Sequence, residues 1–181
     1  MDHLSRIDPE TNDMSQTIPS VGTGPSGIAV GDDALWVADT FGAALLRVDP
    51  SSGESQSVGL AGQPSQVSFT ANGVWVSFAP AGIARVDPSN LSVALTQSVG
   101  SGPTAVLSAF ESIWVANRSD GTVSRLEPST GRVEATVSVG EGPNSLGAAA
   151  GSLWVGNEFA DSITAIDPTT DTAEPAVRVG G

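Results

Sequence analysis

The sequence has no cysteine and no lysine among its 181 residues, and its single histidine is His3. Without cysteine, disulfide bonds and thiolate chemistry are excluded. Twenty acidic residues against seven arginines give a net charge of −13, which argues against nucleic acid or an anionic membrane surface as a partner. No apolar run reaches the roughly 18 residues that a membrane span needs, and Met1 to Glu10 lack the apolar core of a signal peptide. We therefore expect a soluble chain without membrane insertion or an export signal in these residues, and its compartment stays open.

Four tryptophans recur at a nearly constant interval along the chain. Each is followed by valine and preceded by an apolar residue; they are Trp36, Trp75, Trp114 and Trp154. Around each of them the same order of turns and short apolar runs is repeated. A unit of about 40 residues built from short strands and turns is typical of a β-propeller blade. The repeat therefore predicts an all-β fold of four-stranded antiparallel blades.

The third repeat shows the four strands of a blade, which we name A to D from the centre outward. Apolar and β-branched runs between turn signals predict them at residues 103–108, 112–117, 122–126 and 132–139. Strand A follows a Gly-x-Gly-Pro turn, strand B contains the tryptophan, and strand C ends at an acid-proline pair because proline cannot donate to a ladder. Strand D alternates, as expected of an outer strand with one solvated face.

Acid-proline pairs mark each repeat at the same place. They are Asp8-Pro9, Asp49-Pro50, Asp87-Pro88, Glu127-Pro128 and Asp167-Pro168. In such a turn the carboxylate accepts hydrogen bonds from backbone amides and proline fixes the next φ angle. A turn explains every member, so a ring of catalytic carboxylates is not needed. Arginines two residues before four of the pairs (Arg6, Arg47, Arg85 and Arg125, with Ala165 in the fifth) predict structural ion pairs or hydrogen bonds within or between blades.

The number of strands predicts an incomplete ring. Residues 1–24 supply strands C and D only, at about 4–7 and 15–21, and four full blades follow at about 25–62, 63–102, 103–142 and 143–181. The last blade is expected to have strands at 146–149, 153–157, 162–166 and 173–179. Most propellers close with six to eight blades. An arc exposes the apolar flank of a terminal blade, so we expect either a fragment of a larger propeller protein or self-association through open blade edges.

The tryptophans lie on strand B, which predicts that all four are buried between blades rather than stacked on a ligand. The loops that join strands B and C are the least repetitive part of the chain, and binding residues concentrate in such loops. Their candidates for a ligand face are Asp39, Phe41, Phe78, Asn117, Arg118, Asp120, Asn157, Glu158 and Phe159. Aromatic rings beside hydrogen-bonding groups suit a small molecule or a peptide. In the alternative interpretation, each phenylalanine folds back as a cap on the core.

Other kinds of site find little support in the sequence. Asn117, Asp120, Glu158 and Asp161 lack the alternate-ligand spacing of a calcium loop. No Ser-His-Asp set, histidine cluster or phosphate-binding loop can be assembled. We therefore predict no catalytic residues, no metal site and no cofactor.

Several segments resemble a known family of repeats. Residues 24–31 (GPSGIAVG), 34–39 (ALWVAD) and 122–131 (TVSRLEPSTG) resemble the YVTN-type, or surface-layer-like, β-propeller repeats of bacteria and archaea, and the related streptogramin lyase (virginiamycin B lyase) family. The resemblance covers essentially the whole chain but is weak for any one activity. Lyases of that family are seven-bladed and use a histidine base, neighbouring acids and magnesium. His3 lies in the half-blade, so none of those catalytic residues can be placed on this sequence.

These observations favour a non-catalytic β-propeller module that binds a small molecule, a peptide or a protein on its B-C loop face, with no nucleic-acid partner. Two alternatives remain open. In the first, the chain is a non-catalytic part of a streptogramin-lyase-like enzyme, which would be a carbon-oxygen lyase. In the second, it is the sensory propeller domain of a signalling or regulatory protein.

Overall fold

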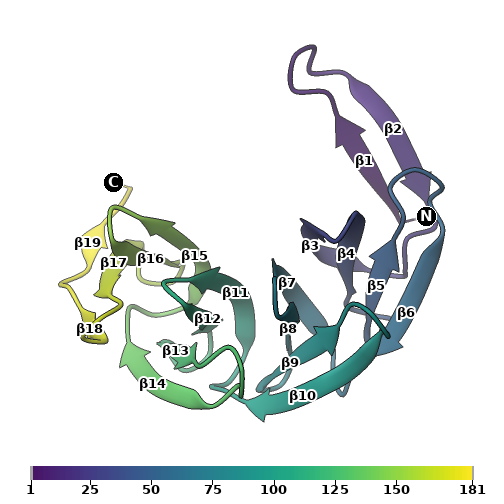
Figure 1. The fold of residues 1–181 in the computed structure, drawn as a ribbon. Helices are drawn as coiled ribbons and strands as arrows, with labels where there is room; N and C mark the ends of the chain where they lie inside the picture. Colours follow the sequence, from purple (N-terminus) through teal and green to yellow (C-terminus); the bar gives the residue numbers. More distant parts are fainter. Residues whose placement is uncertain (1, 181) are drawn as a thin grey trace.

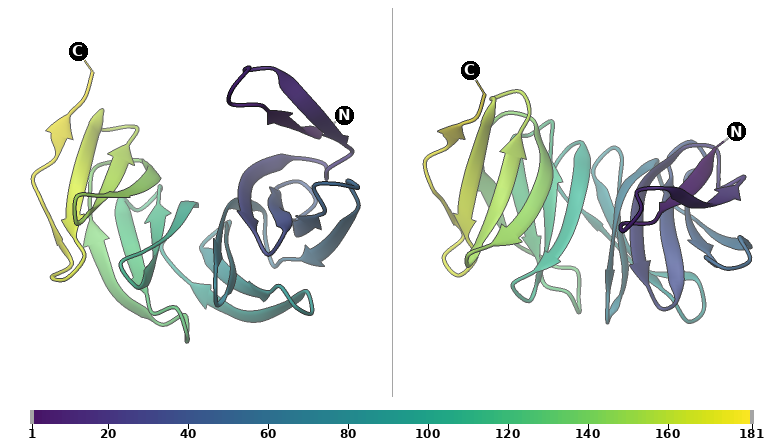
Figure 2. Two further views of the ribbon diagram at one scale, coloured as in Figure 1. Left: turned by 45° about the horizontal axis from the view of Figure 1, so that its top comes forward. Right: turned by 90° about the horizontal axis from the view of Figure 1, so that it is seen from above.

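The structure, a computed structural model, describes residues 2–180 as an all-β arc (Figure 1). The first sheet is a hairpin of two strands, and the four sheets that follow are antiparallel blades. The innermost strands of adjacent blades are neighbours, and the outermost strands lie on the outside of the arc (Figures 1 and 2). The predicted class, four-stranded antiparallel blades plus an N-terminal half-blade in a partial propeller, is confirmed. Within the described residues, no helix is long and apolar enough to cross a membrane.

The strands have the following bounds. The N-terminal hairpin pairs β1 (His3–Ile7) with β2 (Met14–Pro19). The first full blade contains β3 (Pro25–Gly31), β4 (Ala34–Asp39), β5 (Ala44–Val48) and β6 (Ser55–Gly59). The second contains β7 (Pro64–Thr70), β8 (Gly73–Phe78), β9 (Gly82–Asp87) and β10 (Ser92–Ser98). The third contains β11 (Pro103–Ala109), β12 (Ser112–Asn117), β13 (Thr122–Leu126) and β14 (Val133–Ser138). The fourth contains β15 (Pro143–Ala149), β16 (Ser152–Asn157), β17 (Ser162–Asp167), β18 (Thr172–Ala173) and β19 (Val177–Arg178).

The outer strand of the fourth blade differs from the sequence prediction. One strand was expected over residues 173–179, but β18 and β19 are two short pieces that each pair with β17. Pro175 lies between them and has no amide hydrogen to give to the ladder. The fourth blade therefore has the weakest outer edge of the four.

The acid-proline turns are held by the carboxylate of their first residue. Asp49 accepts hydrogen bonds from the Ser51 amide at 2.7 Å, the Ser51 hydroxyl at 2.6 Å and the Ser52 amide at 3.0 Å. The bonds from Ser51 and Ser52 lower the pKa of Asp49 from 3.8 to about 2. Glu127 makes the corresponding bonds, foremost with the side chain of Thr130, and its pKa falls from 4.5 to about 2.

Three tryptophans fill the contacts between consecutive blades. Trp36 shares a core cluster with Val67 and Val74 of the second blade. Trp75 does the same with residues of the third blade, and Trp114 with Leu153 of the fourth. All three indoles are fully buried. In the first three blades, the tryptophan is therefore buried between its own sheet and the blade that follows.

Trp154, in the fourth blade, is 37% exposed. The prediction that all four tryptophans are buried between blades is wrong for this residue. Its indole nitrogen still donates to the carbonyl of Ala149 at 3.2 Å, as Trp114 donates to Ala109. Among the described residues, however, no blade follows to cover the ring.

The four recurring arginines are predicted to bond within or between blades. Arg85 and Arg125 connect blades, and Arg47 donates to the carbonyl of Asp32 in its own blade at 3.5 Å. Arg85 donates to the carbonyls of Pro128 and Ser129 in the acid-proline turn of the next blade, at 2.9 and 3.0 Å. Arg125 forms a bidentate pair with Asp171 in the corresponding turn of the fourth blade, at 2.7 and 2.9 Å. Arg85 also lies over Trp75, with its guanidinium carbon 5.8 Å from the ring centroid, and Arg47 lies over Trp36 at 6.0 Å.

We predict that Trp114→Ala lowers the free energy of unfolding by about 3–5 kcal/mol, because it empties a site filled from two blades. Trp154→Ala is the matched control and should cost clearly less, because part of its ring already faces solvent. Urea denaturation followed by circular dichroism measures both. Equal losses for the two variants would contradict the assignment of Trp114 to the contact between blades.

We also predict that the stability falls as the pH drops from about 5 toward 2. A carboxylate whose pKa is lowered in the folded state stabilises it above the unfolded pKa, and this contribution is lost as the pH falls through the folded pKa. Glu127→Gln should therefore reduce the urea midpoint at pH 6.5 and flatten the acid dependence. Glu111→Gln, at the turn between β11 and β12, is the control and should keep the slope of the unaltered chain. A Glu127→Gln variant with an unchanged pH profile would show that the turn bonds do not contribute.

Candidate ligand face

The B-C loops lie at the same edge of each blade as the crossings from the preceding outer strand. One backbone hydrogen bond between loop and crossing recurs at the same position in every full blade. The first loop residue donates its amide to a carbonyl of the crossing, in the pairs Thr40 to Gly24, Ala79 to Gln63, Arg118 to Gly102 and Glu158 to Gly142, all at 2.9 Å. These repeated bonds hold the backbone of the loops. The side chains on this edge can therefore vary without changing the loop framework.

Four of the predicted site residues lie at one structural position, the last residue of strand B and the third after the tryptophan. They are Asp39, Phe78, Asn117 and Asn157, and all four are buried. Aligning the repeats on the tryptophan places these residues together and, by the alternation of a strand, indicates that they share one orientation. The structure thus places these four inside the blade edge rather than on an exposed face.

The polar members of this set bond to their own blade. The Asn117 amide nitrogen donates to Thr122 Oγ1 at 3.1 Å and Ser124 Oγ at 2.9 Å. Asn157 makes the corresponding pair of bonds in the fourth blade, at 3.2 and 2.9 Å. Asp39 instead accepts from the amide of Thr23 at 2.9 Å. These side chains join strand B to strand C or to the crossing, so they position the loops.

Phe41 and Phe159 are the two exposed phenylalanines of the B-C loops, at 75% and 62% exposed. Each ring lies against a glycine of the crossing in its own blade, and a Cβ atom at Gly24 or Gly142 would collide with it. Each ring therefore covers backbone on one side and faces solvent on the other. Phe78, by contrast, is the buried cap that the alternative interpretation describes.

A charged cluster joins the loops of the third and fourth blades. Arg118 Nη2 lies 2.7 Å from Glu158 Oε2, and the Arg118 guanidinium carbon lies 4.7 Å from the centroid of the Phe159 ring. Asn144 donates to the same oxygen of Glu158 at 3.0 Å. Three predicted residues are thus brought together on one exposed surface. Asp120 lies beside this group in sequence, and its carboxylate accepts from the amide of Ser101 at 2.7 Å.

The sequence interpretation missed Asn144, although its position gives a signal. It follows the proline that begins strand A, where the other three blades have Ser26, Ser65 and Thr104. Those hydroxyls bond across to carbonyls of the next inner strand, at 3.0, 2.8 and 3.1 Å. Asn144 is the only amide in this series, and it bonds to Glu158 instead.

A shallow hollow of about 270 Å³ lies beside this cluster. Its lining includes Asn144, Glu158, Asp161 and Ser162. Together with Arg118 and the open side of the Phe159 ring, it offers hydrogen-bond donors, acceptors and an apolar surface within one small area. Within residues 2–180, no three histidine, aspartate or glutamate side chains form a group that could hold a metal ion.

Neither a protein-family model nor a curated protein matches this chain. Among solved structures it is similar to a chain of hydrazine synthase from Kuenenia stuttgartiensis, with a TM-score of 0.79 and 17% identity. The match covers 88% of this chain and 51% of that chain, so this chain spans about half the length of its structural relative. At this identity the likeness concerns the fold alone: a β-propeller-like arrangement of repeated four-stranded blades, without assignment to a family.

Proposed function

We propose that the chain is a non-catalytic binding module that takes a small organic ligand or a peptide on its B-C loop face. The observation that carries the proposal is the exposed cluster of Arg118, Glu158 and Phe159, which joins the loops of two blades. A guanidinium held over an aromatic ring presents its remaining N–H groups in a fixed orientation. The cluster thus combines a rigid apolar surface with oriented donors and acceptors, which is the composition of a recognition site.

Two further observations support this function. The loop backbones are fixed by the repeated amide bonds to the crossings, so little conformational entropy is lost when a ligand binds. The single histidine lies on β1 of the N-terminal hairpin, outside the B-C loops. We place the module among propellers with YVTN-type repeats, on the basis of the repeat sequences. Its ancestry is shared with the streptogramin lyase superfamily in this proposal, but its activity is not.

We predict that Phe41→Ser and Phe159→Ser, singly or together, leave the urea midpoint nearly unchanged, because more than half of each ring already faces solvent. Phe78→Ser should lower stability by about 3 kcal/mol or more, because it removes a buried ring and places a hydroxyl in the core. A large loss of stability in the Phe41→Ser, Phe159→Ser double variant would show that these rings belong to the core and not to the ligand face.

Binding is tested with a library of displayed random peptides selected on the immobilised chain. We predict that the selected peptides bind at least roughly tenfold more weakly to the Phe159→Ser and Arg118→Ser variants, as expected when an interface loses a central residue. The exposed Val93→Ser on β10 is the control and should bind them as the unaltered chain does. Peptides whose binding survives both loop substitutions would place the recognition surface elsewhere.

A further inference from the structure

The N-terminal hairpin has the place of strands C and D of a blade, and its inner edge is open. In every full blade strand C lies between strand B and strand D, whereas β1 pairs only with β2 among the described strands. The hairpin stands at one end of the arc with β1 on its inner side (Figure 1). The edge of β1 therefore offers backbone donors and acceptors to a further antiparallel strand.

The blade beside this hairpin has an uncovered inner surface. Ile28 and Val30 on β3 are 51% and 73% exposed. At the position of Ile28 the next two blades have Val67 and Val106, which are buried in clusters with Trp36 and Trp75 of the preceding blade. Among the described residues, no preceding tryptophan covers this surface of the first full blade, whereas Trp36 and Trp75 cover the corresponding surfaces of the second and third blades.

An apolar groove of about 570 Å³ runs between the hairpin and this surface. Its walls include Leu4 and Ile18 of the hairpin, and Ile28, Val30 and Leu35 of the first full blade. It continues the core cluster in which Leu4, Ile18 and Leu35 already pack together. The groove is therefore the unfilled inner part of a blade contact whose outer part is complete.

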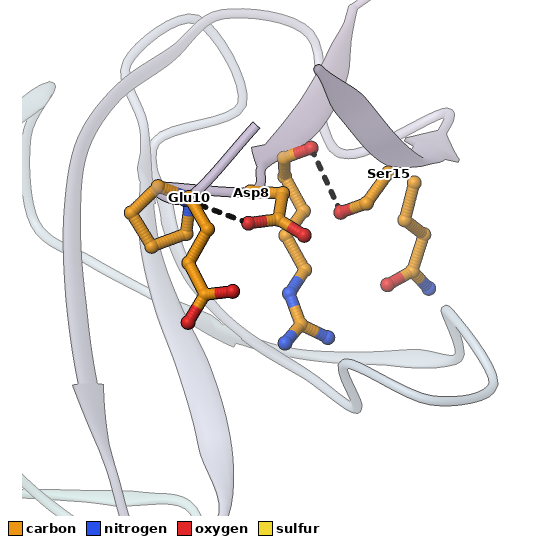
Figure 3. Close-up of a pocket in the computed structure, with 6 residues that line it drawn as sticks. Asp8, Glu10 and Ser15 are labelled. Atoms are coloured by element: carbon orange, nitrogen blue, oxygen red, sulfur yellow. Dashed lines mark hydrogen bonds between the residues drawn. The ribbon is translucent and has the colours of Figure 1, made fainter. Parts of the chain in front are cut away.

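The position of Arg6 indicates where a tryptophan of an added strand would lie. In the three blades with a buried tryptophan, that residue pairs across the strands with the arginine two residues before the acid-proline pair: Trp36 with Arg47, Trp75 with Arg85 and Trp114 with Arg125. Arg6 has this position on β1 and lines both the apolar groove and a polar hollow beside the Asp8-Pro9 turn. Figure 3 shows that hollow, where the Ser15 hydroxyl bonds to the Arg6 carbonyl and the Glu10 amide to Asp8.

We propose that this groove is a docking site for a tryptophan-bearing β-hairpin of a partner polypeptide, which supplies strands A and B and completes the blade. The strand register of the other blades predicts how the docked hairpin pairs with β1. Its tryptophan lies opposite Arg6, and a small residue lies opposite Leu4. A second copy of this chain is disfavoured as the donor. Each of its tryptophan-bearing strands, β4, β8, β12 and β16, is already paired on both sides.

The probe for this site is a synthetic peptide with the sequence of residues 103–117, which contains strands A and B of the third blade. Titrated into the full chain, it should shift the amide NMR signals of residues 4–7 and 28–30 in a saturable manner. The same peptide with Trp114→Ala should bind at least roughly tenfold more weakly, because it lacks the central anchor. Arg6→Ala in the chain should weaken binding about threefold through the lost cation–π contact.

Val30→Asp is the decisive variant of the chain, because Val30 is exposed and its replacement should not disturb the fold. It should abolish peptide binding, whereas Val93→Asp on the solvent side of β10 should not. Equal effects of the two substitutions would overturn the proposal. So would a concentration-dependent dimer in sedimentation that Val30→Asp disperses, because the occupant would then be a second copy.

A fused version covers the case in which the free peptide does not form a hairpin. A copy of residues 103–121, which includes a B-C loop of native length, is joined directly before β1, so that the local concentration of the hairpin is high. The fusion should raise the urea midpoint of the chain, and Trp114→Ala within the added copy should cancel the increase. If neither the free nor the fused hairpin has an effect, the groove is not a hairpin site.

Discussion

The packing of one blade's tryptophan against the inner strands of the next blade is the interaction on which the rest of this structure depends. Trp36, Trp75 and Trp114 each fill a space that their own sheet cannot close. The other connections follow the same direction along the chain. Arg85 and Arg125 reach forward to the next acid-proline turn, and the hydroxyls of Ser26, Ser65 and Thr104 reach forward to the next inner strand. Each blade is thus completed by its successor.

This forward dependence explains why we propose binding sites in the loops and at the ends of the arc. The contacts between blades fix the strands, and the amide bonds at the loop edge fix the loop backbone. The side chains of Arg118 and Phe159 are not needed to hold the loop backbone, so they can form the recognition surface that we propose. At the two ends of the arc, no neighbouring blade among the described residues covers the apolar side chains, which therefore face solvent. The N-terminal groove and the exposed Trp154 both arise where no neighbouring blade in the structure covers an apolar surface.

Much of the fold follows from the sequence because strands and turns are local properties. Alternating apolar residues and acid-proline pairs predict the bounds of β12 and β13 without error. One failure has a local cause, since Pro175 divides the outer strand of the fourth blade, and the others concern packing between neighbours. Trp154 is flanked by leucine and valine much as Trp114 is flanked by isoleucine and valine, but among the described residues no blade lies beyond Trp154. Phe78 ends strand β8 and is buried, whereas Phe41 lies in a loop and is exposed. In the candidate site, Arg118, Glu158 and Phe159 were named in advance, but their contact across two blades is a tertiary fact that no local pattern contains.

The divided outer strand of the fourth blade is one reason why the ends of the arc open before its middle. In a linear array, each unit is stabilised by its nearest neighbours, so the terminal unit with the fewest contacts unfolds at the lowest free energy. β18 and β19 give only short ladders to β17, and among the described residues no blade follows Trp154. Protection from hydrogen exchange should therefore be lowest in the two-stranded N-terminal hairpin and in the C-terminal blade, while β8 and β12, buried between neighbours on both sides, exchange only with global unfolding. The free energy of local unfolding is therefore highest in the middle of the arc and lower at its ends.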